Sequence, residues 1–202
     1  MAAQQDVRAA LDIMALEIGM ASYNPFCASG IWKNPSGDCT NASTNQQYKG
    51  IQSAGPKGIT VEMDIAGGGG DGSQEDGIIS APNEIIEYAY DDSSQTITRK
   101  VNCGTAIPFL GGGTGAVAGT KTVNLINTDA GTKNCNGDPA IFRYYDSKGN
   151  ELSPDKYATD FPKIRRIDIA LAVQTEQQDP STGKYREMIY STSVLVRNHA
   201  LN

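Results

Sequence analysis

The sequence predicts an α+β fold, in which one long N-terminal helix packs on an antiparallel β-sheet with long, disulfide-stapled loops. Helical periodicity of apolar residues is sustained only at the N-terminus, later apolar segments alternate with period two, and the four cysteines lie in loops. A chain of 202 residues can bury a substantial core as a single domain. We expect a helix over residues 1–24, a loop region over 25–57 and a β-sheet region over 58–202.

The N-terminal segment carries two apolar stripes at helical spacing. The first stripe has gaps of four and three and contains Val7, Leu11, Met14, Ile18 and Ala21. The second lies nearly opposite and contains Ala9, Ile13, Leu16 and Met20. One apolar face is enough to dock a helix on its own domain. The second face is therefore expected either to be covered by the protein's own long loop or to contact a partner. We expect the helix to stop at Asn24-Pro25, because a residue before proline is driven into an extended conformation.

The rest of the chain is rich in strand patterns. Alternation and turn residues predict strands over 58–64, 84–90, 95–101, 120–127, 140–145, 151–152, 164–175 and 186–197. The last two are the longest, and the turn Asp179-Pro-Ser-Thr-Gly183 joins them with proline and glycine where each is favoured. Because hairpins connect these strands, the sheet is expected to be antiparallel.

Composition and charge exclude some functions. The net charge of −6 argues against non-specific binding to nucleic acid or anionic lipid, which requires basic patches. No run of residues approaches the roughly 20 apolar residues that cross a bilayer as a helix. The 22 glycines indicate many turns and irregular loops.

The cysteines point to an oxidising compartment. Cys27, Cys39, Cys103 and Cys135 are scattered among polar loops and form no CxxC pair, and the single histidine, His199, lies near the C-terminus. Zinc sites use closer ligand spacings, so disulfides explain the pattern better than a metal, and four reduced thiols in a cytosolic protein are the alternative. Three pairings are open. Cys27–Cys39 with Cys103–Cys135 is favoured, because short loops close most easily.

A glycine-rich acidic segment is a candidate calcium loop. Asp64, Asp71, Glu75 and Asp76 surround a run of glycines, and calcium loops place carboxylates at alternate positions around a glycine turn. The pattern is incomplete, since Pro82 stands where a bidentate glutamate is due. A solvated acidic hairpin tip is the alternative reading. Calcium is the only ligand for which the sequence offers candidate residues, and no other cofactor is expected.

No catalytic motif is present. Residues 111–118 contain a G-x-G-x-x-A, but strand-forming residues follow it instead of the helix that a dinucleotide fingerprint requires. No G-x-S-x-G elbow accompanies His199. The protein is therefore expected not to be an enzyme.

Two ends of the chain carry a family resemblance. Residues 6–25 (Asp-Val-Arg-Ala-Ala-Leu-Asp-Ile-Met-Ala-Leu-Glu-Ile-Gly-Met-Ala-Ser-Tyr-Asn-Pro) resemble the segment after the transmembrane part of PilW-type minor pilins and J-type minor pseudopilins of type II secretion. Residues 164–176, 182–186 and 191–198 look like the closing hairpin of that family, and 142–150 are similar to its penultimate aromatic strand and turn. Gly19 and Ser22 depart from it, since relatives more often have arginine and glycine there.

The resemblance implies a structural minor subunit of a type IV pilus or pseudopilus, acting in filament assembly or priming or at the tip. Its partners would be other minor pilins or pseudopilins and the major pilin, with Ile13, Leu16 and Met20 facing them. It also implies that the native precursor has an apolar helix before the position of Met1, which anchors it in the inner membrane. That helix would be the precursor's only contact with the membrane. The protein would then work in the periplasm or at the cell surface.

Two other classes of function remain as alternatives. A secreted β-rich adhesin or carbohydrate-binding module would expose an aromatic row drawn from Trp32, Tyr88, Tyr90, Tyr144 and Tyr145. A hydrolase would need two carboxylates that face each other in one cleft.

Overall fold

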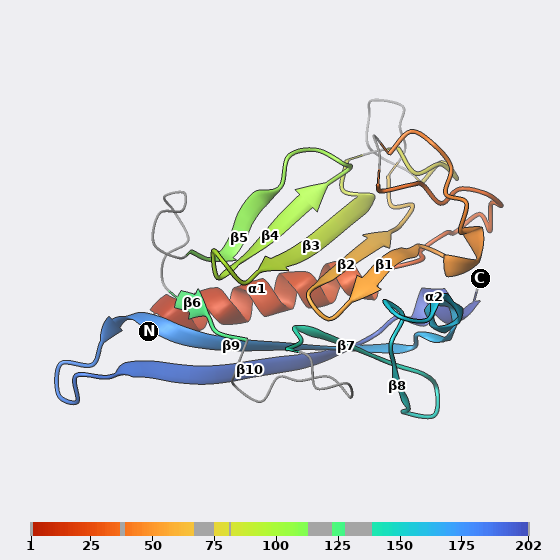
Figure 1. Ribbon diagram of the computed structural model, residues 1–202. Helices are drawn as coiled ribbons and strands as arrows, with labels where there is room; N and C mark the ends of the chain where they lie inside the picture. Colours follow the sequence, from red (N-terminus) through yellow and green to blue (C-terminus); the bar gives the residue numbers. More distant parts are fainter. Residues whose placement is uncertain are drawn as a thin grey trace.

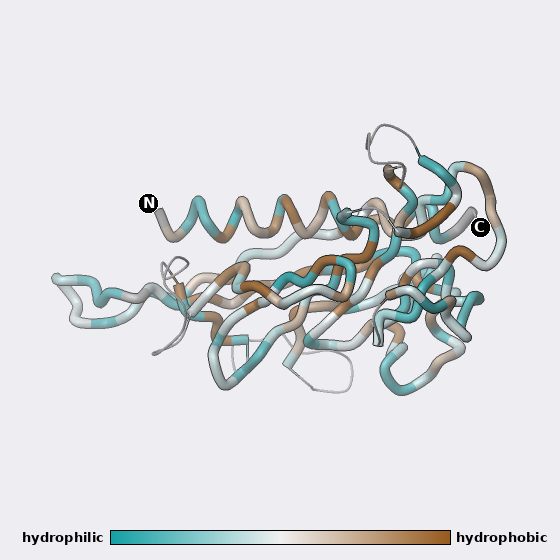
Figure 2. Tube along the Cα trace, turned by 90° about the horizontal axis from the view of Figure 1, so that it is seen from above, coloured by the Kyte–Doolittle hydropathy of each residue, from teal (hydrophilic) through white to brown (hydrophobic). Residues whose placement is uncertain are grey.

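The computed structural model describes residues 2–36, 39–66, 75–80, 82–112, 123–127 and 139–201. Within these ranges the chain is mostly β, with two antiparallel sheets and an N-terminal helix of 18 residues, α1 (Ala2–Gly19). The helix runs along one side of the molecule, where the two sheets meet it (Figures 1 and 2). A short helix, α2 (Arg197–Leu201), follows the last strand, and two 3-10 helices, η1 (Gln46–Tyr48) and η2 (Ala158–Lys163), lie in connections.

The first sheet is a five-stranded meander. Its order is β1-β2-β3-β4-β5, formed by β1 (Ile51–Gly55), β2 (Gly58–Glu62), β3 (Ile85–Asp91), β4 (Thr96–Val101) and β5 (Ile107–Gly111). The β3–β4 pair is the hairpin predicted from the sequence, and its register sets Tyr88 opposite Arg99.

The second sheet is built around the two longest strands. Its order is β10-β9-β7-β8, formed by β7 (Phe142–Tyr145), β8 (Glu151–Leu152), β9 (Arg166–Gln178) and β10 (Tyr185–Leu195), and β6 (Val123–Leu125) also pairs with β9. The β9–β10 hairpin extends past the N-terminal end of α1 (Figure 1).

The predicted fold class is wrong. The chain is not one long helix on a single sheet, because the strands divide between two sheets and the helix is short. Two strands were missed, β1 inside the expected loop region and β5, where Pro108 and flanking glycines weaken the β pattern. With β1 and β5 present, residues 51–111 complete one sheet on their own. The long C-terminal hairpin then becomes the centre of another.

The main core fills the space between the sheets and α1. Figure 2 shows apolar residues concentrated along the inner strands, while α1, along one long side of the molecule, alternates between apolar and polar residues. A smaller buried cluster lies under the loops at one end and contains Ile31, Trp32, Ile79 and Ile85. The large side chains at the centre of the main core include Tyr88, Phe142, Met14 and Ile18.

Candidate subunit interface

Helix α1 is held by its first apolar stripe. It packs against β10, β9 and β5, so that it closes the opening between the two sheets along one side. The residues of this stripe are 0–5% exposed, as the sequence predicts: Val7, Leu11, Met14, Ile18 and Ala21. The helix itself is shorter than the expected 1–24. It ends at Gly19, and Ser22 then adopts a left-handed conformation (φ +66°) with its N–H bonded to the carbonyl of Glu62 at 2.8 Å.

The second stripe is left largely open. Leu16 is 69% exposed and Ile13 is 43% exposed, and Ala9 beside them is also exposed. Met20 differs, because it is half-buried and packs against the main core. Two of the three predicted partner-binding residues therefore share one accessible face. Of the two alternatives for this face, cover by the protein's own loop is not seen within the described residues, where Ile13 and Leu16 are exposed.

A charged contact fixes the orientation of α1 on the first sheet. Arg99 of β4 donates from Nη2 to Oε1 of Glu17 at 2.6 Å and from Nε to Oε2 at 3.1 Å. The hydroxyl of Tyr88 also donates to Oε2 of Glu17. The hydrogen bond with Glu17 raises the pKa of Arg99, and burial together with the Glu17 carboxylate raises the pKa of Tyr88. Glu17 thus accepts three hydrogen bonds on one flank of the helix, which leaves the exposed stripe free of them.

The C-terminal end of α1 is tied to the end of the chain. Nδ1 of His199 in α2 lies 2.8 Å from Oγ of Ser22 and 3.0 Å from the carbonyl of Lys49, and Nε2 lies 2.8 Å from the carbonyl of Phe161. Both Ser22 and His199 are fully buried, and burial lowers the pKa of His199. The Ser–His pair therefore joins four segments of the chain: the residues after α1, the residue after η1, η2 and α2.

A buried carboxyl lies beneath the loop region. Glu62, at the end of β2, is 0% exposed, and its Oε2 accepts the backbone N–H of Lys33 at 2.9 Å. The side chain of Gln52 lies close enough to lower the pKa of Glu62 slightly, although within the described residues neither Oε1 of Glu62 nor Nε2 of Gln52 makes a hydrogen bond of good geometry. Burial raises the pKa of Glu62 to about 8, because an ionised carboxylate is poorly solvated there. The carboxyl is therefore mostly protonated at neutral pH.

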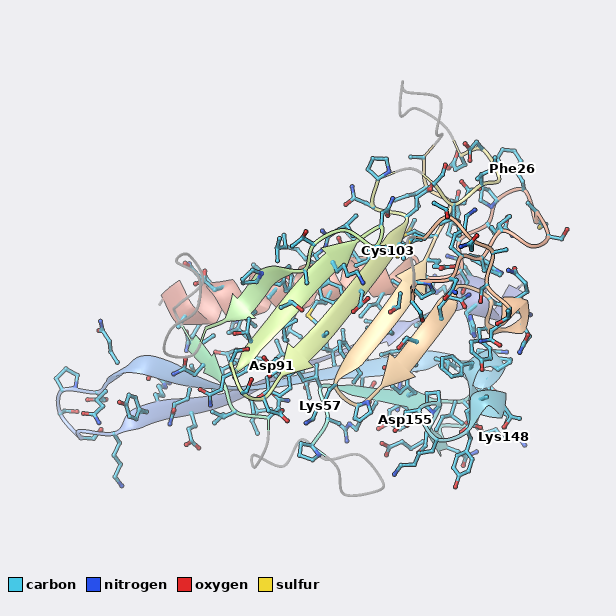
Figure 3. The ribbon with its side chains drawn as sticks, turned by 45° about the horizontal axis from the view of Figure 1, so that its top comes forward. Phe26, Lys57, Asp91, Cys103, Lys148 and Asp155 are labelled. Atoms are coloured by element: carbon cyan, nitrogen blue, oxygen red, sulfur yellow. A yellow bond between two sulfur atoms is a disulfide. The ribbon has the colours of Figure 1, made fainter. Side chains whose placement is uncertain are left out.

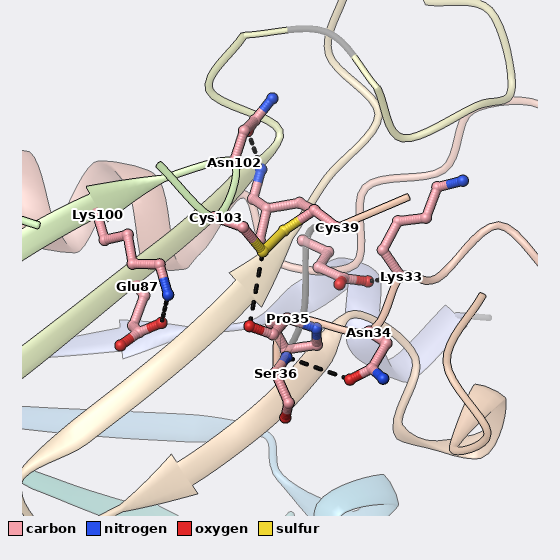
Figure 4. Close-up of a disulfide and its surroundings, with 11 residues drawn as sticks. Lys33, Asn34, Pro35, Ser36, Cys39, Glu87, Lys100, Asn102 and Cys103 are labelled. Atoms are coloured by element: carbon pink, nitrogen blue, oxygen red, sulfur yellow. Dashed lines mark hydrogen bonds and ion pairs between the residues drawn. A yellow bond between two sulfur atoms is a disulfide. The ribbon is translucent and has the colours of Figure 1, made fainter. Parts of the chain in front are cut away.

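The cysteines pair differently from the expectation. A disulfide joins Cys39 to Cys103 and so links the loop region to the residues after β4 (Figure 4). Cys27 is an exposed free thiol. The favoured Cys27–Cys39 and Cys103–Cys135 pairing is therefore wrong, and Cys135 itself lies outside the described residues. The low entropy cost of closing a short loop favoured cysteines close in sequence. In the folded chain, however, the first sheet brings Cys39 and Cys103 together although they are 64 residues apart. Figure 3 shows Cys103 on the same side of the first sheet as the loop that carries Phe26.

The described acidic residues of the candidate calcium loop accept hydrogen bonds from the protein itself. The carboxylate of Asp64 is fully buried and accepts the N–H groups of Gly77 at 2.9 Å and Asp76 at 3.3 Å. Glu75 accepts the hydroxyl of Tyr23 at 3.3 Å, and burial raises the pKa of Asp64. Asp71 lies outside the described residues. Within the described ranges, no three acidic, histidine or cysteine side chains are close enough together to hold a metal ion.

The aromatic residues named for a carbohydrate-binding surface form no exposed row. Trp32, Tyr88, Tyr90 and Tyr144 are each at most 8% exposed. Tyr145 is half-buried, and the guanidinium of Arg166 lies 4.1 Å from its ring centroid. The observation that would have favoured an adhesin or carbohydrate-binding module is therefore absent from these five residues.

Several important polar residues were not found from the sequence. Arg99 and Glu62 stand in unremarkable local patterns, and His199 was noted only as the single histidine. The partners of all three lie far along the chain. The sequence contains one weak signal for the partner of Arg99. Glu17 is a charged residue between the two apolar stripes of α1, and a partly buried charge requires a partner.

The comparisons with known proteins identify no relative. No protein-family model matches the chain, and no curated protein and no solved structure is significantly similar to it. Of the helices in the described ranges, none is both long and apolar enough to cross a membrane.

Proposed function

We propose that this chain is a structural minor subunit of a type IV pilus or pseudopilus, which acts in assembly or priming of the filament or at its tip. The observation that carries the proposal is the exposed apolar stripe of α1, with Leu16 69% and Ile13 43% exposed. In filaments of this class, helices of neighbouring subunits pack against one another in a central bundle. A helix in such a bundle needs one apolar face toward its own domain and a second toward its neighbours.

The way α1 is mounted supports this role. Its inner stripe is buried, its flank is bonded to Arg99, and its C-terminal end is joined to α2 through Ser22 and His199. The second, exposed stripe therefore lies on a helix that the rest of the domain holds in one orientation. Preorganisation of this kind lowers the entropy lost on binding.

Two further features agree with the proposal. The sequence at both ends of the chain resembles PilW-type minor pilins and J-type minor pseudopilins. The Cys39–Cys103 disulfide suits a protein that is exported to an oxidising compartment, such as the periplasm or the cell surface. The partners would be other minor pilins or pseudopilins and the major pilin.

The test is binding of the purified domain to the soluble domains of minor pilins encoded beside it, measured by titration calorimetry. We expect Leu16→Glu to weaken binding by at least about tenfold, because a carboxylate on the helix face would be desolvated in the interface. Ile107→Glu is the matched control, since Ile107 is 54% exposed but lies on β5 of the first sheet.

The outcomes separate the possible roles of the helix. Circular dichroism must show that both variants are folded. Binding that Leu16→Glu weakens and Ile107→Glu spares supports the filament subunit. If Leu16→Glu binds as tightly as the unsubstituted chain, or if no neighbouring subunit binds the unsubstituted chain, the proposal is wrong.

A further inference from the structure

His199 is the single histidine of the chain, and it is fully buried. It belongs to α2, which lies at the same end of the molecule as the C-terminal end of α1 (Figure 1). The two preceding residues of α2 are exposed or half-buried, so among the described side chains of this short helix the ring of His199 is the anchor. The ring contacts three other segments at once, through Ser22, Lys49 and Phe161.

The partners of the ring decide where it carries its proton. Nε2 lies 2.8 Å from the carbonyl of Phe161, which can only accept a hydrogen bond, so Nε2 must be the protonated nitrogen. In the neutral ring Nδ1 is then an acceptor, and the hydroxyl of Ser22 at 2.8 Å is the donor that it needs. The carbonyl of Lys49, 3.0 Å from Nδ1, cannot donate. The neutral ring therefore depends on Ser22 on one side and on Phe161 on the other.

The backbone around Nδ1 is strained. Ser22 and Lys49 have φ values of +66° and +52°, in the left-handed region that residues with a side chain seldom adopt. Such a conformation persists only where the surrounding contacts impose it, and these outliers cluster at functional and switch regions. Both residues contact the ring of His199. Loss of the ring contact would therefore let both relax.

A charged imidazolium is poorly accommodated in this site. Burial lowers the pKa of His199 from its usual 6.5, although the carbonyls of Phe161 and Lys49 would accept from the protonated ring. The two charged side chains that act on the ring, Arg165 and Lys49, are both cations, and they lower the pKa further. A group whose pKa is lowered on folding stabilises the closed state above its unfolded pKa and loses that contribution as the pH falls. Acid therefore favours the state in which the ring is in water.

The geometry points to His199 as an acid-sensitive latch, in which protonation of the ring releases α2 from Ser22 and frees the C-terminal end of α1. Opening would break the contacts to the two carbonyls in the same step, because one ring makes them all. Glu62 is a separate group, since its carboxyl accepts from Lys33 and its pKa of about 8 lies on the other side of neutrality. The inference does not depend on the proposed function, because it concerns only contacts within this chain.

NMR of the ¹⁵N-labelled chain tests the latch directly, because one histidine gives one set of ring signals. At neutral pH, long-range ¹H–¹⁵N correlations should show the ring of His199 in its Nε2–H form. On acidification we expect the ring to titrate with a midpoint below 6.5.

Amide hydrogen exchange of the same sample measures the opening. The amide of Ser22 is bonded to the carbonyl of Glu62 at 2.8 Å, and that of Val196, immediately before α2, to the carbonyl of Arg165 at 3.1 Å. Both should lose about tenfold in protection between about pH 7 and about pH 5, with the same midpoint as the ring. The hydrogen-bonded amide of Ala170 in β9 is the control and should stay protected.

Two substitutions separate the titration from the packing. His199→Gln removes the titration and keeps an amide that can donate to a carbonyl and accept from Ser22, so protection of Ser22 and Val196 should not change with pH. Ser22→Ala removes the donor to Nδ1, while serine and alanine have a similar backbone cost at positive φ. It should raise the pKa of His199, because the neutral ring loses a hydrogen bond. If Ser22 only filled space, the pKa would not move.

The outcomes distinguish a latch from a rigid core contact. A ring midpoint below 6.5 with a parallel loss of protection at Ser22 and Val196, absent from His199→Gln, supports the latch. The latch is excluded if the ring titrates at or above 6.5, if the two amides stay protected while the ring titrates, or if His199→Gln loses protection equally. A parallel loss at Ala170 would also exclude it, because the whole domain would then be unfolding. If His199→Gln does not fold, the titration and exchange of the unsubstituted chain decide alone.

Discussion

Arg99 and Glu17 join α1 to the first sheet across 82 residues of sequence, with the guanidinium Nη2 2.6 Å from the carboxylate Oε1. Their side chains are only 16% and 18% exposed, so little water competes for the two groups. The pair lies next to the buried Tyr88, whose hydroxyl shares the same carboxylate. One charged contact therefore connects α1, whose second stripe is exposed, to β4 of the first sheet.

Replacing Arg99 with alanine should destabilise the domain. Glu17, whose side chain is only 18% exposed, would lose both guanidinium hydrogen bonds, which costs about 1–3 kcal/mol. Urea unfolding at neutral pH measures the loss. Lys100→Ala is the control, because its pair with Glu87 is more exposed (25% and 34%) and is expected to contribute less than about 1 kcal/mol. Equal losses in the two variants would contradict the role given to Arg99.

Stability should fall as the pH rises, because of Glu62. Its pKa is raised from 4.5 to about 8 in the folded chain, so the folded state binds a proton that the unfolded state releases. The stabilisation is fully present below the unfolded value and is lost as the pH rises through about 8. Between pH 4.5 and about pH 8, we expect the free energy of unfolding to fall by up to about 1.4 kcal/mol per pH unit.

Glu62→Gln separates this effect from other titrations. Glutamine has a similar shape and no charge, so the variant should show a flatter profile when unfolding is measured between about pH 5 and about pH 9. It should be more stable than the unsubstituted chain at the alkaline end. A profile as steep as that of the unsubstituted chain would assign the pH dependence to another group.

Gly50→Ala should be strongly destabilising for a steric reason. Gly50 has φ +80°, and an added Cβ would lie 2.8 Å from the ring of Trp32 and 2.9 Å from the carbonyl of Glu62. Gly149→Ala is the matched control, with φ +84° and no atom within 4 Å of the added Cβ. The control should lose about 1 kcal/mol from the left-handed backbone alone. Gly50→Ala should lose at least about 2 kcal/mol more in thermal or urea unfolding. Similar losses in the two variants would contradict the steric explanation, because they would mean that the residues around Gly50 can move to accommodate the added Cβ.

Reducing the Cys39–Cys103 disulfide should lower the stability of the whole domain. The bridge closes a loop with a sequence separation of 64, for which the chain-entropy relation gives about 4 kcal/mol. Cys39→Ser/Cys103→Ser should show a comparable loss without reductant. Peptide mapping after alkylation of the folded, oxidised chain should find Cys27 modified and Cys39 and Cys103 protected. Alkylation of Cys39 in the oxidised chain would contradict this pairing.

Local patterns predicted the local structure well. The inner stripe of α1 is buried as predicted, because periodicity of 3.6 residues decides which side chains share a face. The β3–β4 and β9–β10 hairpins were predicted, because their turn residues and alternation lie within one short segment. The second stripe of α1 was also identified from periodicity, and of its larger residues Ile13 and Leu16 are exposed whereas Met20 is half-buried.

The sequence by itself determined the helix, its two stripes and most of the strands, since each depends on residues that are near neighbours in the chain. Only the tertiary structure decided that the strands form two sheets, that Cys39 meets Cys103 and that Glu17 meets Arg99. These contacts join segments 64 and 82 residues apart, so they depend on how the whole chain packs its core. No short pattern encodes them, because each partner's own neighbours are compatible with many different pairings.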